Sequence, residues 1–319
     1  MSEFIAWLDS PQDVDSGRIG GKGASLARLG AAGFPVPPGF AVTVAAYRAF
    51  HAGHGLDEPV AGLLALDGRP TQAQVREACE PIVARLEHSR LPEPVSTAIA
   101  EAYAQLDART PAGATYAVRS SGVSEDSAGA SFAGLYESYL NLTGTDHVLD
   151  AVLDCYLCLW QPRAVHYRAI KGIDHRKEAM GVVVMQTVQS YVSGVAFSLN
   201  PVTGARDEVV INASWGLGEA IVSGLVTPDN YVALKDGTVA RKDVFEKHVR
   251  IVAAAGGTER EDVPADLANA PALTDEQIGQ VGRTVAEVER HYGCPIDVEF
   301  AYDAHGRFHL LQARPITTV

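Results

Sequence analysis

The chain has 319 residues and a net charge of −13, with 47% apolar and 20% charged residues. This composition predicts a packed core and excludes disorder. The acidic balance argues against a nucleic-acid surface, which needs a basic stripe, although a few basic side chains in a cleft can still focus positive potential on a polyphosphate. The sequence contains no run of 18 apolar residues and no signal-peptide pattern, so we expect a cytoplasmic protein with no membrane partner.

The predicted elements mix helices and strands along the whole chain. In chain order they are a glycine-rich turn entering a helix (18–30), a Pro-rich turn entering a strand (34–43), helices broken near Pro92 and Pro94 (71–107), a strand (114–121), helix (147–171), three strands (181–188, 194–201, 208–216), a hairpin (231–242), a helix (274–293) and a final hairpin (295–316). This order favours an α+β fold over a doubly wound parallel sheet. The length predicts one large two-lobed domain or two intimate domains.

Four cysteines are present, and only Cys155 and Cys158 form a C-x-x-C pair. The pair lies in a helical pattern, and no second pair of ligands lies nearby. We therefore expect a buried helical pair and not a zinc or redox site.

The C-terminal hairpin brings chemically useful side chains to one face. Residues two apart in a strand share a face, so Asp297 groups with Glu299 and Gln312 groups with Arg314. Carboxylate and amide oxygens suit Mg²⁺, and an adjacent arginine can clamp phosphate. The alternative is a solvated face with an ordinary salt bridge.

The register of this hairpin follows from its turn. If Asp303 and Gly306 flank the turn, Glu299 lies opposite Leu310, and the strand partners point to the same side. All four polar side chains then project from a single face.

Two further segments are candidate phosphate contacts. Gly20, Gly21 and Gly23 would let the backbone approach an anion at a helix start, with Lys22 reaching a terminal phosphate. The Walker A spacing is absent, so a helix-start turn with a solvent lysine is the alternative. Arg119 ends a strand before a loop rich in Ser, Gly and Ala, which either covers phosphates with its N–H groups or is a flexible surface loop.

Four long blocks resemble one known family. They are GGKGASLARLGAAGFPVPPGFAVT, YAVRSSGVSEDSAGASFAGLYES, INASWGLGEAIVSGLVTPDNY and DVEF…LLQARPIT. Together they look like the nucleotide-binding region of the phosphoenolpyruvate synthase, pyruvate phosphate dikinase and rifampin phosphotransferase family. The blocks stand in family order and cover essentially the whole chain, which makes them far more specific than any one motif.

The resemblance implies a two-lobed ATP-grasp fold, with lobes at 1–180 and 181–319 and the nucleotide in the cleft between them. The residue roles that it implies are Lys22 and Arg119 on the ATP phosphates, Ser131 to Gly134 as the phosphate-covering loop, Glu299 and Gln312 on Mg²⁺, and Arg314 neutralising the transferring group. Glu219 and the segment 227–231 also match, as support for loops.

The adenine hinge is implied at the backbone of Gln186 and Val188. Here the chain departs from the family pattern, because Met185 stands at the usual Gln and Thr187 at the usual Met.

The implied activity moves a phosphoryl group from ATP, giving AMP and phosphate, to a histidine on a separate carrier domain or chain. None of the ten histidines lies in the usual carrier motif, and we expect His166 and His248 to be structural or surface residues. Two alternatives are a stand-alone ATP-grasp kinase or ligase acting on a small-molecule acceptor, and a nucleotide-binding regulator. The retained side chains argue against the regulator, and they are Lys22, Arg119, Glu299, Gln312 and Arg314.

Overall fold

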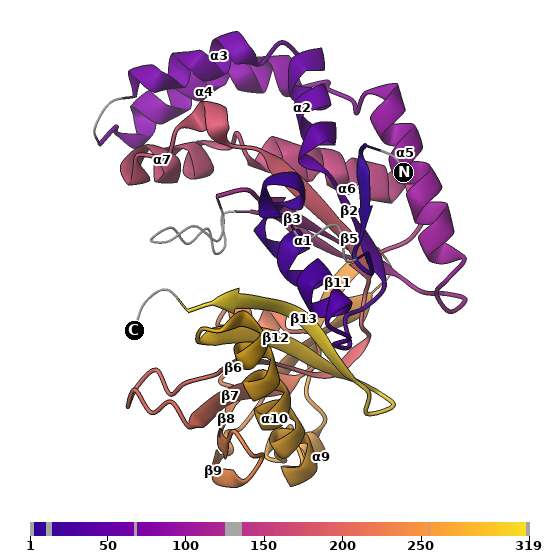
Figure 1. The fold of residues 1–319 in the computed structure, drawn as a ribbon, viewed down its shortest axis with the longest axis vertical. Helices are drawn as coiled ribbons and strands as arrows, with labels where there is room; N and C mark the ends of the chain where they lie inside the picture. The colour runs from indigo at the N-terminus through magenta and orange to yellow at the C-terminus, as the bar shows by residue number, and fades with distance from the viewer. Residues whose placement is uncertain (1–2, 11–14, 67–68, 125–135, 255, 317–319) are drawn as a thin grey trace. The chain divides into compact units, whose positions relative to one another are not determined.

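Figure 1 shows the computed structural model, which describes residues 3–10, 15–66, 69–124, 136–254 and 256–316. The chain forms two compact units. The first contains Met1–Ala31 and Pro38–Gln186, and the second contains Ala32–Pro37 and Thr187–Val319. None of the described helices is long and apolar enough to cross a membrane.

The first unit is built on a five-stranded sheet with the order β1-β2-β5-β3-β4. Its strands are β1 Ile5–Trp7, β2 Gly39–Val42, β3 Tyr116–Gly122, β4 Ser138–Leu142 and β5 Met180–Gln186. All of its pairs are antiparallel. The central strand β5 is buried at every position except its last residue, as its β-branched run predicts.

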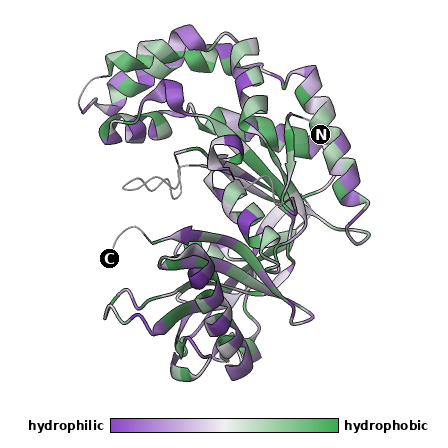
Figure 2. Cartoon of the chain, in the orientation of Figure 1, coloured by the Kyte–Doolittle hydropathy of each residue, from purple (hydrophilic) through white to green (hydrophobic). Residues whose placement is uncertain are grey.

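Helices surround this sheet in the first unit, and Figure 2 shows hydrophobic residues concentrated along the strands. The helices of this unit are α1 Ser16–Ala31, α2 Val44–Gly53, α3 Asp57–Gly62, η1 Leu63–Ala65, α4 Gln72–Leu86, α5 Glu93–Asp107, α6 Thr145–Cys158, α7 Pro162–Lys171 and η2 His175–Lys177. The predicted break near Pro92 is confirmed, because Pro92 is the N-cap of α5 and Pro94 lies in its first turn, where proline removes no helical hydrogen bond. The predicted helix 147–171 is two helices, since Pro162 starts a new one.

Helix α1 differs from its prediction at Gly20. The helix already begins at Ser16, and Gly20 interrupts it with φ 74° and ψ 172°. A Cβ at this position would lie 1.9 Å from the carbonyl oxygen of Ser121. The glycine therefore serves close packing of α1 on β3, together with a backbone conformation that other residues avoid.

The second unit is built on a six-stranded sheet with the order β13-β12-β6-β7-β8-β9. Its elements are β6 Ser190–Phe197, β7 Glu208–Trp215, α8 Glu219–Val222, β8 Asp229–Leu234, β9 Val239–Asp243, β10 Val249–Ala254, β11 Gly257–Asp262, α9 Ala265–Ala268, α10 Asp275–Tyr292, β12 Ile296–Asp303 and β13 Phe308–Pro315. Every strand pair in the described sheets is antiparallel, so the α+β class is confirmed. The separate β10–β11 hairpin was not predicted, because the polar sequence of β11 hides the strand pattern.

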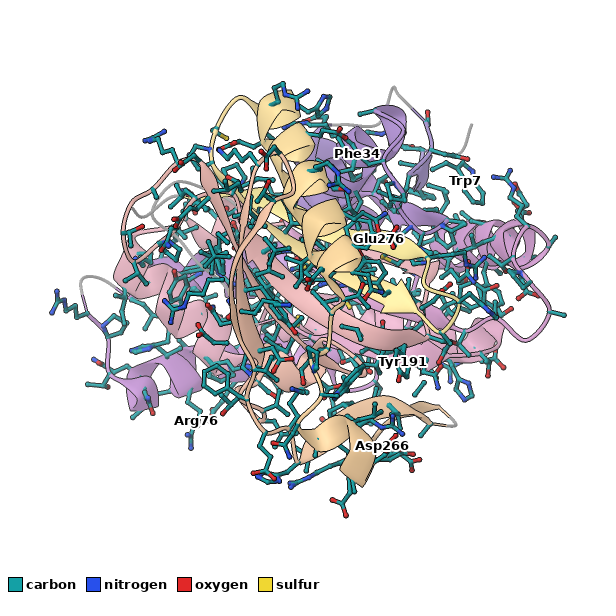
Figure 3. All side chains as sticks on the ribbon, turned by 90° about the horizontal axis from the view of Figure 1, so that it is seen from below. Trp7, Phe34, Arg76, Tyr191, Asp266 and Glu276 are labelled. Carbon is teal, nitrogen blue, oxygen red and sulfur yellow. The ribbon has the colours of Figure 1, made fainter. Side chains whose placement is uncertain are left out.

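Helix α10 forms as its capping box predicts. The Thr274 hydroxyl accepts the N–H of Gln277, and the Gln277 side chain accepts the N–H of Thr274. The hydroxyl of Tyr302 in β12 donates to the carbonyl oxygen of Gln277 at 3.2 Å. Phe34, labelled in Figure 3, makes an edge contact with His291 in the last turn of α10. The Tyr302 contact fastens the helix to the sheet that carries the final hairpin.

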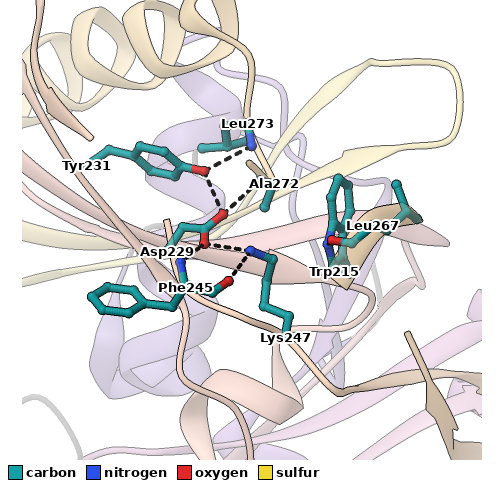
Figure 4. A network of polar contacts seen from close by, with 8 residues as sticks. All are labelled: Trp215, Asp229, Tyr231, Phe245, Lys247, Leu267, Ala272 and Leu273. Carbon is teal, nitrogen blue, oxygen red and sulfur yellow. Dashed lines mark hydrogen bonds and ion pairs between the residues drawn. The ribbon is translucent and has the colours of Figure 1, made fainter. Parts of the chain in front are cut away.

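A buried ion pair ties the loops of the second unit to β8. Asp229 and Lys247 are both fully buried and lie 2.6 Å apart (Figure 4). Asp229 also accepts the backbone N–H groups of Phe245 and Ala272, at 2.9 and 2.8 Å. The expectation that the segment 227–231 supports loops therefore has a physical basis, because one carboxylate fixes two chain segments.

Candidate functional site

The C-terminal hairpin places its four polar side chains in two directly opposed pairs. Asp297 lies opposite Arg314, and Glu299 lies opposite Gln312. The predicted register was wrong by two residues, because it set Glu299 opposite Leu310.

The two-residue difference in register has two structural causes. The turn is one residue longer than predicted, since the N–H of Asp303 donates to the carbonyl oxygen of Arg307. A β-bulge between Glu299 and Phe300 adds the second residue. A shift of two residues preserves the side-chain face, so both pairs remain on the face that the sequence indicates.

Arg314 is held by Asp297. Its Nε donates to both carboxylate oxygens, at 3.0 and 2.7 Å. Burial raises the pKa of Asp297, the Arg314 charge lowers it, and the nearby Glu299 raises it. The contact orients the guanidinium plane, and the carboxyl groups of Asp297 and Glu299 place oxygen atoms on this face on which a cation can bind.

Glu299 and Gln312 offer hard oxygen ligands from neighbouring strands. Glu299 is half-buried and Gln312 is buried. Among the described residues no group of three or more His, Cys, Asp or Glu side chains is placed to hold a metal ion. The donor set here fits Mg²⁺, which commonly takes one or two protein oxygens and fills its remaining positions with phosphate and water.

Lys22 and Arg119 belong to two elements of the first unit that pack together, α1 and β3. The Lys22 Nζ donates to the carbonyl oxygen of Ser120, next to Arg119 in β3, at 3.0 Å. Helix α1 is fixed there because the Ser121 hydroxyl accepts the N–H of Gly23 at 3.0 Å and donates to Ile19. Lys22 therefore contacts β3 at the residue that follows Arg119. The sequence reasoning named Lys22 and Arg119 but missed Ser121, whose hydroxyl fixes α1, since serine in a strand carries no distinctive signal.

The chain leaves β3 toward the predicted phosphate-covering loop. Ser131 and Gly134 lie outside the described residues. At the start of this segment, the Ser124 hydroxyl donates to the buried carboxylate of Glu178. The N–H of Val123 donates to the carbonyl oxygen of Ala179. These contacts fix the point from which the chain leaves β3.

The expected adenine hinge follows β5. The Gln186 N–H donates to the carbonyl oxygen of Pro38 at 2.9 Å, and the Val188 carbonyl accepts the Ser190 hydroxyl at 3.1 Å. Met185 and Thr187, where the chain departs from the family pattern, are both buried. Directly after Val188, a pocket of about 210 Å³ is lined by Gln189, Ser190, Tyr191 (labelled in Figure 3), Leu217, Val252 and Ala304, among others.

The cysteines and histidines that the sequence analysis expected to be structural or surface residues lie in buried or exposed positions of that kind. Cys155 and Cys158 are fully buried in α6, and burial raises the pKa of Cys155 well above its usual value. A ring nitrogen of His166 lies 3.0 Å from the carbonyl oxygen of Pro70, whereas the side chain of His248 is 74% exposed.

Comparison with known proteins matches the chain to one family. The family model described as "Pyruvate phosphate dikinase, AMP/ATP-binding domain" matches residues 16–319. A "Probable phosphoenolpyruvate synthase" of Methanocaldococcus jannaschii is 42% identical over 99% of this chain and 27% of its own length. The phosphoenolpyruvate synthase of Pyrococcus furiosus is 38% identical over 99% of this chain and 44% of its own. A "Rifampicin phosphotransferase" of a Streptomyces species is 38% identical over 97% and 36%.

These matches confirm the family predicted from the four sequence blocks. The chain spans about a quarter to a half of the length of these relatives. Among solved structures, D-cycloserine synthetase is similar at a TM-score of 0.26 and 10% identity, covering 90% of this chain and 59% of that one. A similarity at that level does not define the fold.

Proposed function

Because this chain belongs to the AMP/ATP-binding domain family of pyruvate phosphate dikinase, we propose that it transfers a phosphoryl group from bound Mg·ATP to a histidine on a separate carrier domain or chain. The β-phosphoryl group moves to the histidine and the γ-phosphate passes to water, so AMP and phosphate are the other products. The observation that carries the proposal is the hairpin face, where Glu299 lies opposite Gln312 and Asp297 grips Arg314.

The proposed fold is a two-lobed ATP-grasp fold that binds one nucleotide with both lobes, 1–180 and 181–319. The first unit contributes Lys22 and Arg119 to the phosphates, and Ser131 to Gly134 cover them. The second contributes Glu299, Gln312 and Arg314. The backbone of Gln186 and Val188 takes the adenine.

Phosphoryl transfer requires positioning and charge neutralisation more than covalent chemistry by the protein. Lys22 and Arg119 hold the phosphate chain, and Arg314 meets the charge that moves between donor and acceptor. Glu299 and Gln312 would hold Mg²⁺, which supplies charge neutralisation on the phosphate oxygens. Asp297 keeps the Arg314 guanidinium in place, so its reorganisation during the reaction is small.

The test supplies ATP labelled at the β-phosphate and a histidine domain taken from a phosphoenolpyruvate synthase. We expect label on that domain and AMP in solution, both absent when the domain is omitted. Glu299→Ala and Arg314→Ala should lower transfer by about 100- to 1000-fold. Because these groups act mainly on the transition state, nucleotide affinity should change less than turnover.

Arg241→Ala is the matched control for Arg314→Ala. Arg241 lies on β9 of the same sheet in an exposed ion pair with Asp243, so its removal should leave transfer unchanged. Turnover with a small molecule alone would favour a stand-alone kinase or ligase. Nucleotide binding without turnover of any acceptor would favour a regulator.

A further inference from the structure

The connection between β6 and β7 is a tightly bonded turn. The Asn200 side-chain oxygen accepts the N–H groups of Val202 and Thr203, at 2.9 and 3.2 Å. The N–H of Asn200 donates to the carbonyl oxygen of Ala205 at 2.9 Å, and that of Gly204 donates to the carbonyl of Asn200 at 2.8 Å. One residue thus organises the whole segment 200–205.

The turn is also anchored to the sheet. Asn200 is buried, and its Nδ2 donates to the Glu208 carboxylate at the start of β7, at 2.7 Å. At the tip, Val202 is 91% exposed, the highest value among the exposed large apolar side chains of the described residues. A single exposed valine is ordinary by itself. This one stands on a preorganised frame, which lowers the entropic cost of binding through it.

The turn lies at the end of the sheet that carries Arg314. Phe197 of β6 pairs with Asp297 of β12, which pairs with Arg314, and the N–H of Ser198 donates to the carbonyl oxygen of Ile296. The turn begins at Asn200, directly beyond these contacts. Figure 1 shows the arrowhead of β13 and the β6–β7 connection on the same side of this sheet.

A macromolecular acceptor must cover this end of the sheet. Reacting atoms have to approach within about 3–3.5 Å before transfer. A histidine on a folded domain reaches Arg314 only with the surrounding surface of that domain. That surface then meets the connections at this end of the sheet, and the turn 200–205 is one of them.

We propose that the turn 200–205 is a docking element for the carrier domain that bears the acceptor histidine, and that Val202 enters an apolar recess on that domain. The inference rests on the proposed function, because a small-molecule acceptor would have no surface to meet Val202. The turn contributes to recognition of the carrier and not to the chemistry of the nucleotide.

The test measures transfer to a separately supplied histidine domain of a phosphoenolpyruvate synthase, with wild type, Val202→Ala and Val202→Asp. We expect Val202→Asp to raise the KM for the carrier about tenfold or more, because a carboxylate replaces an apolar group that docking would bury, and Val202→Ala to raise it less. The kcat at saturating carrier and the thermal shift on adding Mg·ATP should stay at wild-type values.

Val222→Asp is the matched control. Val222 is 69% exposed in α8, which follows the opposite end of β7, so this variant should keep the wild-type KM. Wild-type KM in Val202→Asp, with an active wild-type protein, would overturn the docking role alone. An equal rise in KM for Val202→Asp and Val222→Asp would assign the effect to the added charge, and it would also overturn the docking role. Absence of transfer by wild type would overturn the proposed function, and the docking role with it.

Discussion

At the scale of single residues, breaking the Asp229–Lys247 pair should lower stability strongly, since both side chains are fully buried. Lys247→Met leaves the Asp229 charge buried with two backbone N–H groups and the Tyr231 hydroxyl as its remaining contacts. Removing one partner of such a pair costs about 3–5 kcal/mol of unfolding free energy. We therefore expect a clearly lower melting temperature by calorimetry.

Lys242→Met is the control for this prediction. Lys242 pairs with Asp275 at 2.7 Å, but both side chains are well exposed. Such pairs contribute about 0–1 kcal/mol, so this variant should melt near wild type. Equal melting temperatures for the two variants would contradict the importance of the buried pair.

His175 should make stability depend on pH. Burial and the Arg168 charge lower its pKa from 6.5 to about 4. In the folded protein His175 therefore stays neutral at a pH where the unfolded chain already binds a proton, so its contribution is present above pH 6.5 and is lost as the pH falls toward about 4. We expect the melting temperature of His175→Gln to depend less on pH across this window than that of wild type. His248→Gln, at an exposed position, should follow wild type, and identical profiles for all three proteins would contradict the assignment.

At the scale of elements, the packing of α1 against β3 determines the position of Lys22. Gly20→Ala introduces a Cβ 1.9 Å from the Ser121 carbonyl at a φ of +74°, so α1 must shift. The backbone conformation alone costs about 1–3 kcal/mol. We expect a lower melting temperature and a smaller stabilisation by Mg·ATP, because Lys22 follows two residues later.

Gly113→Ala separates the backbone effect of Gly20→Ala from the effect of its close contact with Ser121. Gly113 also lies in the first unit with a φ of +80°, but a Cβ there meets nothing within 4 Å. This variant should lose some stability through its backbone and keep the full response to Mg·ATP. A full nucleotide response in Gly20→Ala would show that the seat of α1 does not govern the phosphate site.

At the scale of the whole molecule, nucleotide binding should stabilise the native state. A ligand at a hundredfold excess over its Kd adds about 2.7 kcal/mol to the unfolding free energy. Thermal shift assays with ATP plus Mg²⁺, and with ATP plus a chelator, measure this effect. We expect the larger shift with Mg²⁺, and Glu299→Ala should reduce the difference between the two conditions. No shift at millimolar Mg·ATP would contradict an intact site.

Local sequence determined the elements and the family. The strand run at β5, the capping box of Thr274 and the proline break before α5 depend on residues that are neighbours in the chain, so they are readable without tertiary structure. The four blocks likewise identify the family, because each is a continuous stretch. Asp297 and Glu299 are two residues apart in one strand, and this spacing predicted that they share a face.

Only the tertiary structure decided which residues meet across the fold. The hairpin register depends on a bulge beside Glu299, and the partner of Lys247 lies 18 residues away in sequence. The serine contacts that seat Lys22 join residues 98 apart. Such pairings are selected by the simultaneous packing of distant segments, and the same local pattern is compatible with several of them. For this reason the sequence predicts which side chains would carry the chemistry, while the fold shows how those among the described residues are held.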